Sequence, residues 1–458
     1  MKLPPSLPLP TSLQSLLWVR RPTQLMDYWA RRYGHAYRLK LMPYELHVFS
    51  DPDSIRSIFA AKSEDMHAGE INRILRVLVG QRSVLLLDDA EHMRHRKLLL
   101  PSFHGERMRF YGNTMAEITR ASVVGFREGS MFALHPHTQE ITLQIILRTV
   151  FGADEGAELD TLRKRIKLLL SRGESRLAFP LLLLLANHPE LEARQPLRYM
   201  LRARAATDEL LYQIIAARRA DPNAATRKDV LATLMQARDE DGEPMTDREL
   251  RDELVTALAA GHETTATALA WAVERILAHP DVHARLKQEL RTTSGAPLTP
   301  EQIAALPYLD ATIKEVLRLR PIIPIVGRIL KKPTNLGGYD LPAQTAVAAC
   351  IYLAHRNPDI YPQPDEFRPE RFLNAAIDPV TWLPFGGGIR RCVGAQFATY
   401  EMKIVLATLL ASCDFELAQP SPVRIVRRAI TLFPERGTCV RLIRKLGVEG
   451  QPALAHSA

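Results

Sequence analysis

Apolar and polar positions alternate along residues 36–50, where the runs AYRLKL and YELHVFS lie on either side of Met42-Pro43. Alternation with a period of two is typical of half-buried strands, so we predict a small hairpin here. From residue 52 to residue 330 helical periodicity dominates. A second strand region is expected at about 336–352, followed by an ordered meander rich in Pro, Gly and Arg over 353–394 and by a helix from about Ala395 to Leu410.

The strongest helix signal begins at Thr246. Thr246 and Glu249 have the spacing of a capping box, and no proline follows until Pro280. A helix of about 33 residues would be about 50 Å long, which is enough to cross a whole domain. We therefore expect this helix to run through the core.

The chain shows no repeat, no low-complexity linker and no break in composition. We therefore predict a mainly α fold with a minor β part in one domain, residues 26–446, with an N-terminal extension (1–25) and a C-terminal tail (447–458). Prolines interrupt the first apolar stretch, and no segment reaches the roughly 18 apolar residues that a membrane span requires. We expect neither a membrane span nor a signal peptide, and hence a cytoplasmic protein.

Composition narrows the class of protein. The 458 residues are 46% hydrophobic and 24% charged, as in soluble globular proteins. Although the net charge is +9, the 60 basic residues are interleaved with 51 acidic ones, so we expect no nucleic-acid arm and look instead to an acidic protein partner. The four cysteines lie far apart, which argues against a disulfide framework and indicates a reducing compartment.

Small side chains recur along one face of the long predicted helix, at Ala257, Ala260, Gly261, Thr264 and Ala268. A broad, flat ligand could lie against this face, but on this feature alone close helix packing is the stronger explanation. The neighbouring pair Glu263-Thr264 favours a functional role, because an acid beside an alcohol can relay protons. Both are candidate catalytic residues.

A glycine-rich loop precedes the helix expected from Ala395. It reads Phe385-Gly-Gly-Gly-Ile-Arg-Arg-Cys-Val-Gly394 and ends at a helix N-terminus. Glycines let the backbone approach a ligand closely, and the helix N-terminus together with Arg390 and Arg391 favours a thiolate at Cys392. A lone cysteine is more often a small buried hydrophobe, but this fixed order of residues favours a ligand-binding loop.

These motifs resemble those of the cytochrome P-450 haem-thiolate monooxygenases, over almost the whole chain and in the same order. The loop fits the family pattern F-G-x-G-x-R-x-C-x-G at every fixed position. Residues 260–265 (AGHETT) match the oxygen-binding part of the family's central helix. Glu315-x-x-Arg318 and the segment 369–372 (PERF) match a charged pair and the motif that completes it, which implies a buried triad of Glu315, Arg318 and Arg371.

The resemblance implies that haem b lies between the long central helix and the helix after the cysteine loop, with Cys392 as its axial iron ligand. A thiolate ligand donates electron density that favours O–O cleavage. Further cofactor contacts are implied for Phe385, Gly386 and Gly394 of the loop and for four propionate donors: His92, Arg96, Arg328 and Arg390. Many family members carry Trp where His92 stands, so Arg96 is the firmer assignment.

The resemblance further implies a soluble, bacterial-type enzyme that uses O2 and hydroxylates or epoxidises an apolar small molecule, such as a fatty acid, a terpenoid or a secondary metabolite. Electrons would come from a separate ferredoxin or flavodoxin with its reductase, and we expect a monomer. Two other interpretations stay open: a haem sensor or carrier without turnover, and a peroxide-driven or isomerising variant. Retention of Glu263 and Thr264 argues against both. The motifs G-x-S-x-G, GxxxxGK[ST] and H-E-x-x-H are not present.

Four apolar segments are candidates for the substrate pocket, although leucine-rich stretches are by default core. They are residues 83–89, 175–185, 321–326 and 429–433. Their composition favours a lipid-like or terpenoid molecule over a sugar or a nucleotide.

Overall fold

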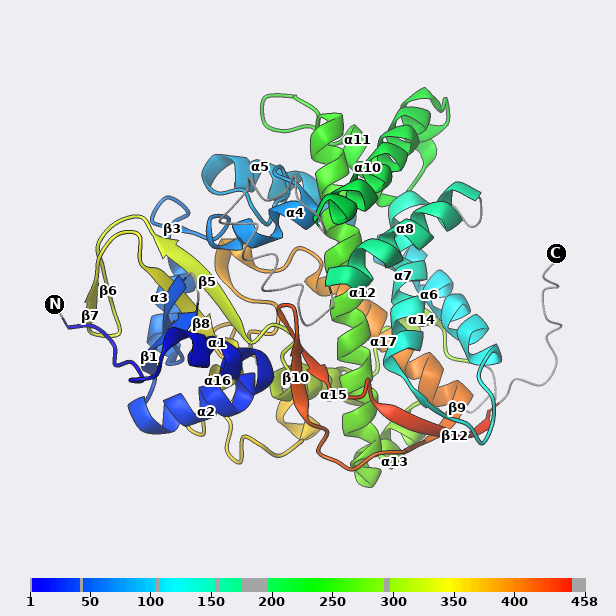
Figure 1. Cartoon of the computed structure of the whole chain (residues 1–458). Coiled ribbons are helices and arrows are strands. Elements are labelled where there is room, and N and C mark those ends of the chain that lie inside the picture. The colour runs from blue at the N-terminus through cyan, green and yellow to red at the C-terminus, as the bar shows by residue number, and fades with distance from the viewer. Residues whose placement is uncertain are drawn as a thin grey trace.

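The computed structural model describes residues 2–446 apart from 42–43, 104, 106, 153–156, 174–196 and 292–296. The predicted pocket segment 175–185 and the predicted tail 447–458 lie outside the described residues. Helices make up most of the molecule, and most of the smaller β part lies to one side with the N-terminal helices (Figure 1). The mainly α fold with a minor β part is therefore confirmed.

The helices follow one another along the whole chain. They are α1 (Thr11–Arg20), α2 (Pro22–Tyr33), α3 (Pro52–Ala60), α4 (Arg76–Val79), α5 (Asp89–Leu99), α6 (Arg107–Val124), α7 (His135–Phe151), α8 (Ala157–Gly173), α10 (Leu197–Ala220), α11 (Val230–Gln236), α12 (Asp247–Leu277), α13 (Pro280–Glu289), α14 (Pro300–Ala304), α15 (Pro307–Leu319), α16 (Ile351–Ala354) and α17 (Ala395–Ser412).

The main sheet has five strands in the order β1-β2-β8-β5-β3. They are β1 (Ala36–Leu41), β2 (Tyr44–Phe49), β8 (Ala346–Cys350), β5 (Ile325–Leu330) and β3 (Met66–His67). The predicted hairpin is confirmed, with Ala36 opposite Phe49 in the antiparallel β1–β2 pair. Strand β2 then pairs in parallel with β8, which brings Val48 opposite Ala348 and joins distant parts of the chain.

Three smaller sheets complete the β part. They comprise β4 (Met131–Ala133) with β12 (Cys439–Lys445) and β9 (Cys413–Leu417), β10 (Ile425–Arg428) with β11 (Thr431–Pro434), and β6 (Thr334–Leu336) with β7 (Tyr339–Leu341). The strand region expected at 336–352 is thus divided among β6, β7 and β8.

Helix α12 crosses the middle of the helical part, as the green ribbon in Figure 1 shows. Its N-terminus is the predicted capping box: the Thr246 hydroxyl accepts the Glu249 N–H at 3.3 Å, and the Glu249 carboxylate accepts the Thr246 N–H at 2.8 Å. The helix ends at Leu277, three residues before Pro280. It packs against α7 and α17, so the prediction of a helix through the core is confirmed.

The N-terminal residues pack against the main sheet. Trp18 is only 3% exposed, and Trp29 stacks on Tyr37 of β1 with ring centroids 5.7 Å apart. The Arg38 side chain donates to the Pro4 carbonyl at 2.7 Å. The chain before β1 is therefore part of the layer that covers this side of the molecule.

The predicted triad forms a buried group that we call the balanced cluster: Glu315, Arg318 and Arg371. Glu315 and Arg318 are fully buried, with Arg318 Nε 2.6 Å from Glu315 Oε2. Arg371 Nε lies 3.4 Å from Glu315 Oε1. Arg318 also donates to the His355 and Pro364 carbonyls, at 2.7 and 2.8 Å. The cluster thus ties α15 to the meander, as predicted.

Candidate active site

Cys392 lies in a loop whose shape is set by backbone hydrogen bonds. The Cys392 N–H donates to the Phe385 carbonyl at 2.9 Å, which closes the loop, and Gly394 is the residue before α17. The Phe385 ring meets Trp382 edge to face, with centroids 6.1 Å apart. Cys392 keeps accessible surface, whereas Cys350 and Cys413 are buried. The loop therefore presents the one thiol that its sequence pattern marks as a ligand.

Glycine is required at two positions of this loop. Gly386 and Gly388 have φ angles of 67° and 63°, in the left-handed region that other residues rarely adopt. A Cβ on Gly388 would stand 1.9 Å from the Phe59 carbonyl oxygen of α3. A Cβ on Gly394, in contrast, would meet no protein atom within 4 Å, so packing within the protein does not require glycine there.

The surroundings of Cys392 shift the pKa of its thiol in opposite directions. Burial among protein atoms raises the pKa of its thiol, while the Gly394 N–H, Arg96 and Arg391 lower it. Arg96 of α5 also donates to the Arg391 carbonyl at 2.7 Å. Helix α5 is thereby fixed beside the loop, with a positive charge close to the sulfur.

The four predicted propionate donors lie near one another, and we call them the cation cluster: His92, Arg96, Arg328 and Arg390. They come from α5, from β5 and from the cysteine loop. Burial, together with the positive charges of Arg390, Arg96 and Arg328, lowers the pKa of His92 to about 3. The structure thus brings together side chains that the sequence separates by about 300 positions.

Most of the positive charge in the cation cluster is not balanced by the protein. Arg328 is 7% exposed and donates to the adjacent Gly327 carbonyl at 2.8 Å. Burial lowers the pKa of Arg328 to about 10, and the charge on Arg390 contributes. Within the described part of the chain, neither Arg96 nor Arg328 forms an ion pair, and His92 Nδ1 is buried without a hydrogen-bond partner.

Arg390 differs from the other members of the cation cluster because it has a carboxylate partner. Its Nη2 lies 2.5 Å from Asp88 Oδ1, and its guanidinium also donates to the Val84 and Leu87 carbonyls. The same Asp88 accepts the backbone N–H of Gly69 at 2.8 Å. The predicted pocket segment 83–89, which follows α4, therefore holds Arg390 and through Asp88 also binds the backbone at Gly69.

The other described pocket segments meet each other. The Leu432 N–H donates to the Ile322 carbonyl at 2.8 Å, which joins 429–433 to 321–326. Leu432 and Phe433 are buried, whereas Ile430 is 38% exposed. Segment 321–326 leads directly into β5 and so toward Arg328.

Glu263 and Thr264 lie at the middle of α12 but point to different partners. Glu263 accepts from Gln139 Nε2 at 2.6 Å and lies 3.4 Å from His135 Nε2, both on α7. Burial raises the pKa of Glu263, but the hydrogen bonds from His135 and Gln139 outweigh it, so the pKa lies below its ordinary value. The Thr264 hydroxyl donates to the Ala260 carbonyl at 2.5 Å. No direct hydrogen bond is recorded between this acid and this alcohol.

A further acid, which the sequence analysis did not identify, lies behind the Thr264 turn. Glu401 of α17 is 1% exposed and faces Thr265 of α12. Neither carboxylate oxygen has a hydrogen bond of ordinary geometry, and burial raises the pKa of Glu401 well above its usual range. Glu401 is the single acidic residue in the largely apolar sequence of α17, and this is the sequence signal that could have identified it. Its position next to segment 260–265 depends on how α12 and α17 pack.

The arrangement defines the class of site. An accessible cysteine sits at a glycine loop, and the half-buried Arg96, which forms no ion pair among the described residues, lies beside it. A central helix with small residues at Ala257 and Ala260 packs against the helix that follows the loop. Donors of this kind fit a planar group that carries carboxylates and a thiolate-bound metal. The open space at the Cβ position of Gly394 is consistent with this fit.

Comparison with known proteins agrees with this class. Residues 3–439 match the family model for cytochrome P450. The chain is similar to cytochrome P450 135B1 of Mycobacterium tuberculosis, with 41% identity over 96% of this chain and 92% of the relative. It is 36% identical to cytochrome P450 135A1 of the same organism, over 97% of this chain and 96% of the relative. The solved structure of retinoic acid bound cyanobacterial CYP120A1 is similar, with a TM-score of 0.81, 25% identity and coverage of 97% and 100%.

The chain belongs to the cytochrome P450 family. Members of this family bind haem b through a cysteine thiolate, and the family and fold support a haem-thiolate monooxygenase. Among the described residues, no helix is long and apolar enough to span a membrane.

Proposed function

We propose that this protein is a monooxygenase that inserts one oxygen atom of O2 into an apolar small molecule, with electrons from a separate redox protein. The observation that carries the proposal is the accessible Cys392 thiol at the glycine loop, next to the cation cluster. Haem b bound there by Cys392 supplies O2 activation. Arg96 and Arg328, whose charges the protein leaves unbalanced, would hold its carboxylates, together with His92 and Arg390.

The chain's own contribution to oxygen chemistry is control of protons at the middle of α12. Thr264 carries a hydroxyl on the accessible face of the helix, next to Ala260. Glu263 is ionised at neutral pH and is held toward α7 by Gln139 and His135. Glu263 therefore takes up protons on the α7 side, and its side chain or a water chain connects it to Thr264.

The substrate is an apolar molecule such as a fatty acid, a terpenoid or a secondary metabolite, which the enzyme hydroxylates or epoxidises. The described pocket segments support this, because 83–89, 321–326 and 429–433 are rich in aliphatic side chains. The similar CYP120A1 structure has retinoic acid bound, which is an apolar chain with one acidic end.

The electron donor is an acidic protein, a ferredoxin or a flavodoxin with its reductase. Arg391 supports this role because it is exposed and lies beside Cys392. Lys97 is a weaker docking candidate, because its Nζ lies 2.6 Å from Glu240. Electrostatic attraction of the donor by such surface charges should weaken as the salt concentration rises.

Removal of the thiol tests the proposal most directly. Wild-type protein should contain haem b, and its reduced CO complex should show the far-red Soret band of a thiolate ligand. Cys392→Ala should lose this band, whereas the control Cys439→Ala, a half-buried cysteine elsewhere, should keep it. An imidazole-type band in wild type, or a thiolate band in Cys392→Ala, would refute the assignment.

Replacement of Thr264 tests turnover and thereby separates an enzyme from a sensor or carrier. Thr264→Ala should bind haem and substrate normally but form roughly 10-fold less product per reduced cofactor consumed, with the electrons appearing as hydrogen peroxide. The matched control is Thr312→Ala on α15, where the hydroxyl makes the same bond to a carbonyl four residues earlier, at 2.7 Å. Unchanged coupling in Thr264→Ala would remove Thr264 from the mechanism.

A further inference from the structure

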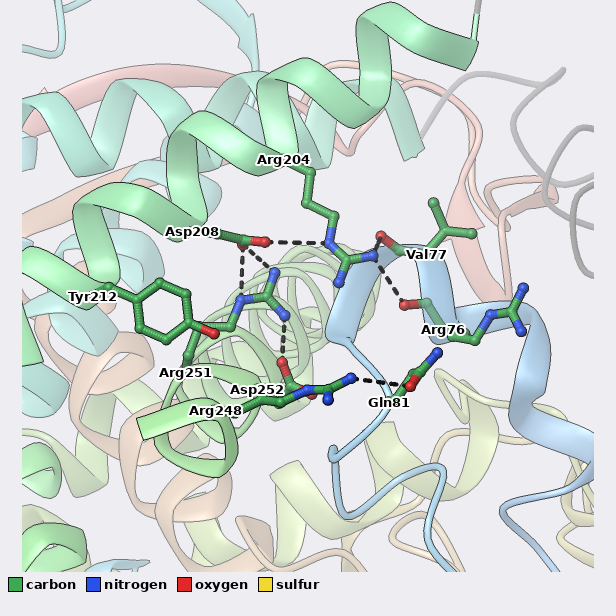
Figure 2. A pocket seen from close by; sticks show the side chains of 9 residues that line it. All are labelled: Arg76, Val77, Gln81, Arg204, Asp208, Tyr212, Arg248, Arg251 and Asp252. Carbon is green, nitrogen blue, oxygen red and sulfur yellow. Dashed lines mark hydrogen bonds and ion pairs between the residues drawn. The ribbon is translucent and has the colours of Figure 1, made fainter. Parts of the chain in front are cut away.

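A cavity lies away from Cys392, between three segments (Figure 2). It measures about 390 Å³ and is bounded by α4 and the turn after it, by α10, and by the first turns of α12. Charged and polar side chains converge on it from all three segments. Val77 is the only purely aliphatic side chain among its described lining residues. The cavity therefore suits a compact polar ligand rather than a hydrocarbon.

The lining of this cavity is rich in arginine. Four of its described lining residues are arginines and two are aspartates; the arginines are Arg76, Arg204, Arg248 and Arg251. The acids of the first turn of α12 do not pair with Arg248, because they pair elsewhere. Asp247 lies 2.6 Å from Arg219, and Glu249 lies 2.9 Å from Arg94.

Both lining aspartates bind Arg251, and Asp208 also lies 3.6 Å from Arg204 Nε. Arg251 Nε donates to Asp208 at 2.8 Å, and Arg251 Nη1 donates to Asp252 (Figure 2). Asp252 also accepts the backbone N–H of Arg82 at 2.7 Å. Arg248, in contrast, donates to the uncharged amide oxygen of Gln81 at 3.0 Å. The carboxylates thus neutralise one side of the cavity and leave the Arg248 side positive.

The backbone at the start of α12 adds positive electrostatic potential to the cavity. Arg248 lies in the first turn of α12, where the aligned peptide dipoles give partial positive charge. Guanidinium groups bind carboxylates and phosphates through paired N–H donors, and the Tyr212 hydroxyl lies on the cavity wall as a further donor (Figure 2).

We propose that this cavity is an anion-binding effector site, separate from the haem site, that takes the phosphate or carboxylate group of a small polar ligand. Hydrogen bonds across its lining also join separate segments of the fold. Arg204 of α10 donates to the Val77 carbonyl of α4 at 2.8 Å. A bound anion bridges Arg248 to the other arginines and so fixes α10 and α12 against the segment 76–84.

The segment 76–84 links this cavity to the haem side. Asp252 holds the Arg82 N–H, and Glu253 accepts the Val84 N–H at 2.7 Å. The Val84 carbonyl in turn accepts from Arg390 of the cation cluster at 3.2 Å. Occupancy of the cavity therefore orders a stretch of chain that reaches Arg390, which gives the site a physical route to influence haem and substrate.

The test is calorimetric titration of the full, haem-containing protein with inorganic phosphate, and separately with acetate, at constant pH and ionic strength. We expect one site per chain and an affinity for the favoured anion that falls about tenfold in Arg248→Gln. Arg248 is exposed and its contact is with a neutral amide, so this variant should fold normally. Arg436→Gln, which removes an exposed arginine outside the cavity, is the control for loss of net charge.

Hydrogen exchange provides a second readout. The anion should slow exchange of the amides of residues 76–84 in wild type and in Arg436→Gln but not in Arg248→Gln. A preference for phosphate over acetate would identify a phosphorylated ligand, and the reverse a carboxylic acid. Absence of binding heat with either anion, or equal weakening in Arg248→Gln and Arg436→Gln, would overturn the proposal.

Discussion

The balanced cluster and the cation cluster are both buried groups of charged side chains, but they differ in how their charge is compensated. In the balanced cluster, Glu315 lies between Arg318 and Arg371, and backbone carbonyls accept the remaining Arg318 donors. In the cation cluster, Arg96 and Arg328 have no carboxylate partner in the described chain. Burial of uncompensated charge is costly, so the first group stabilises the fold and the second is arranged for an anionic ligand.

The largest effect should come from breaking the balanced cluster. Glu315→Gln would leave Arg318 fully buried without its counter-charge, which should lower the free energy of unfolding by about 3–5 kcal/mol. Denaturant unfolding and soluble yield measure this loss. The control Glu370→Gln removes an exposed carboxylate that pairs with Arg285 and should cost less than about 1 kcal/mol. Equal unfolding free energies for the two variants would show that Glu315 does not stabilise the core.

Glu401 represents a third case, a buried acid with no partner charge. Its pKa is raised above 4.5, so the folded protein keeps the proton while the unfolded chain releases it. Stability should therefore fall as pH rises above about 4.5, until the pH passes the folded-state pKa. Glu401→Leu should remove this penalty and raise the free energy of unfolding by about 1–3 kcal/mol at pH 8, and by less at pH 5.

Denaturant unfolding at both pH values checks this prediction. Glu416→Leu, at an exposed acid on β9, controls for the added apolar side chain and should show no such pH-dependent gain. A destabilised Glu401→Leu variant at pH 8 would mean that this carboxyl has a favourable partner in the folded protein.

The smallest change in the free energy of unfolding is expected for a substitution in the cation cluster. Such a substitution should instead weaken the binding of haem. Arg328→Gln removes a buried charge that has no carboxylate partner, so the free energy of unfolding of the haem-free protein should not fall and should rise by no more than about 1 kcal/mol. Haem should nevertheless dissociate about tenfold more readily, which transfer of haem to apomyoglobin measures. The exposed Arg424→Gln is the control. A loss of haem-free stability comparable with that of Glu315→Gln would remove the distinction between the two clusters.

The features that could be predicted from the sequence are those that depend on residues close together along the chain. Thr246 and Glu249 cap the helix that they precede, and Glu315 and Arg318 are one helical turn apart, so short-range spacing sufficed. The glycine loop was recognised because backbone shape and the cysteine occur in one run of ten residues.

The side chains that orient the site could not be predicted in this way. Glu263 is held by Gln139, 124 positions earlier, and Arg390 by Asp88, 302 positions earlier. Such pairs depend on how α7 and α12, or the cysteine loop and segment 83–89, come together in three dimensions. Periodicity along the chain carries no information about that packing.

The parallel pairing of β2 with β8 has a consequence for how the protein is made. Val48 reaches its partner Ala348 only after some 300 further residues have been synthesised, which takes about 15–60 s at ribosomal rates of about 5–20 residues per second. During that time the N-terminal hairpin, with Tyr37 and Phe49 that are fully buried in the final fold, lacks the strand that covers its edge. Nascent chains should therefore need a chaperone at the ribosome, and slower translation before residue 346 should lower the yield of soluble protein.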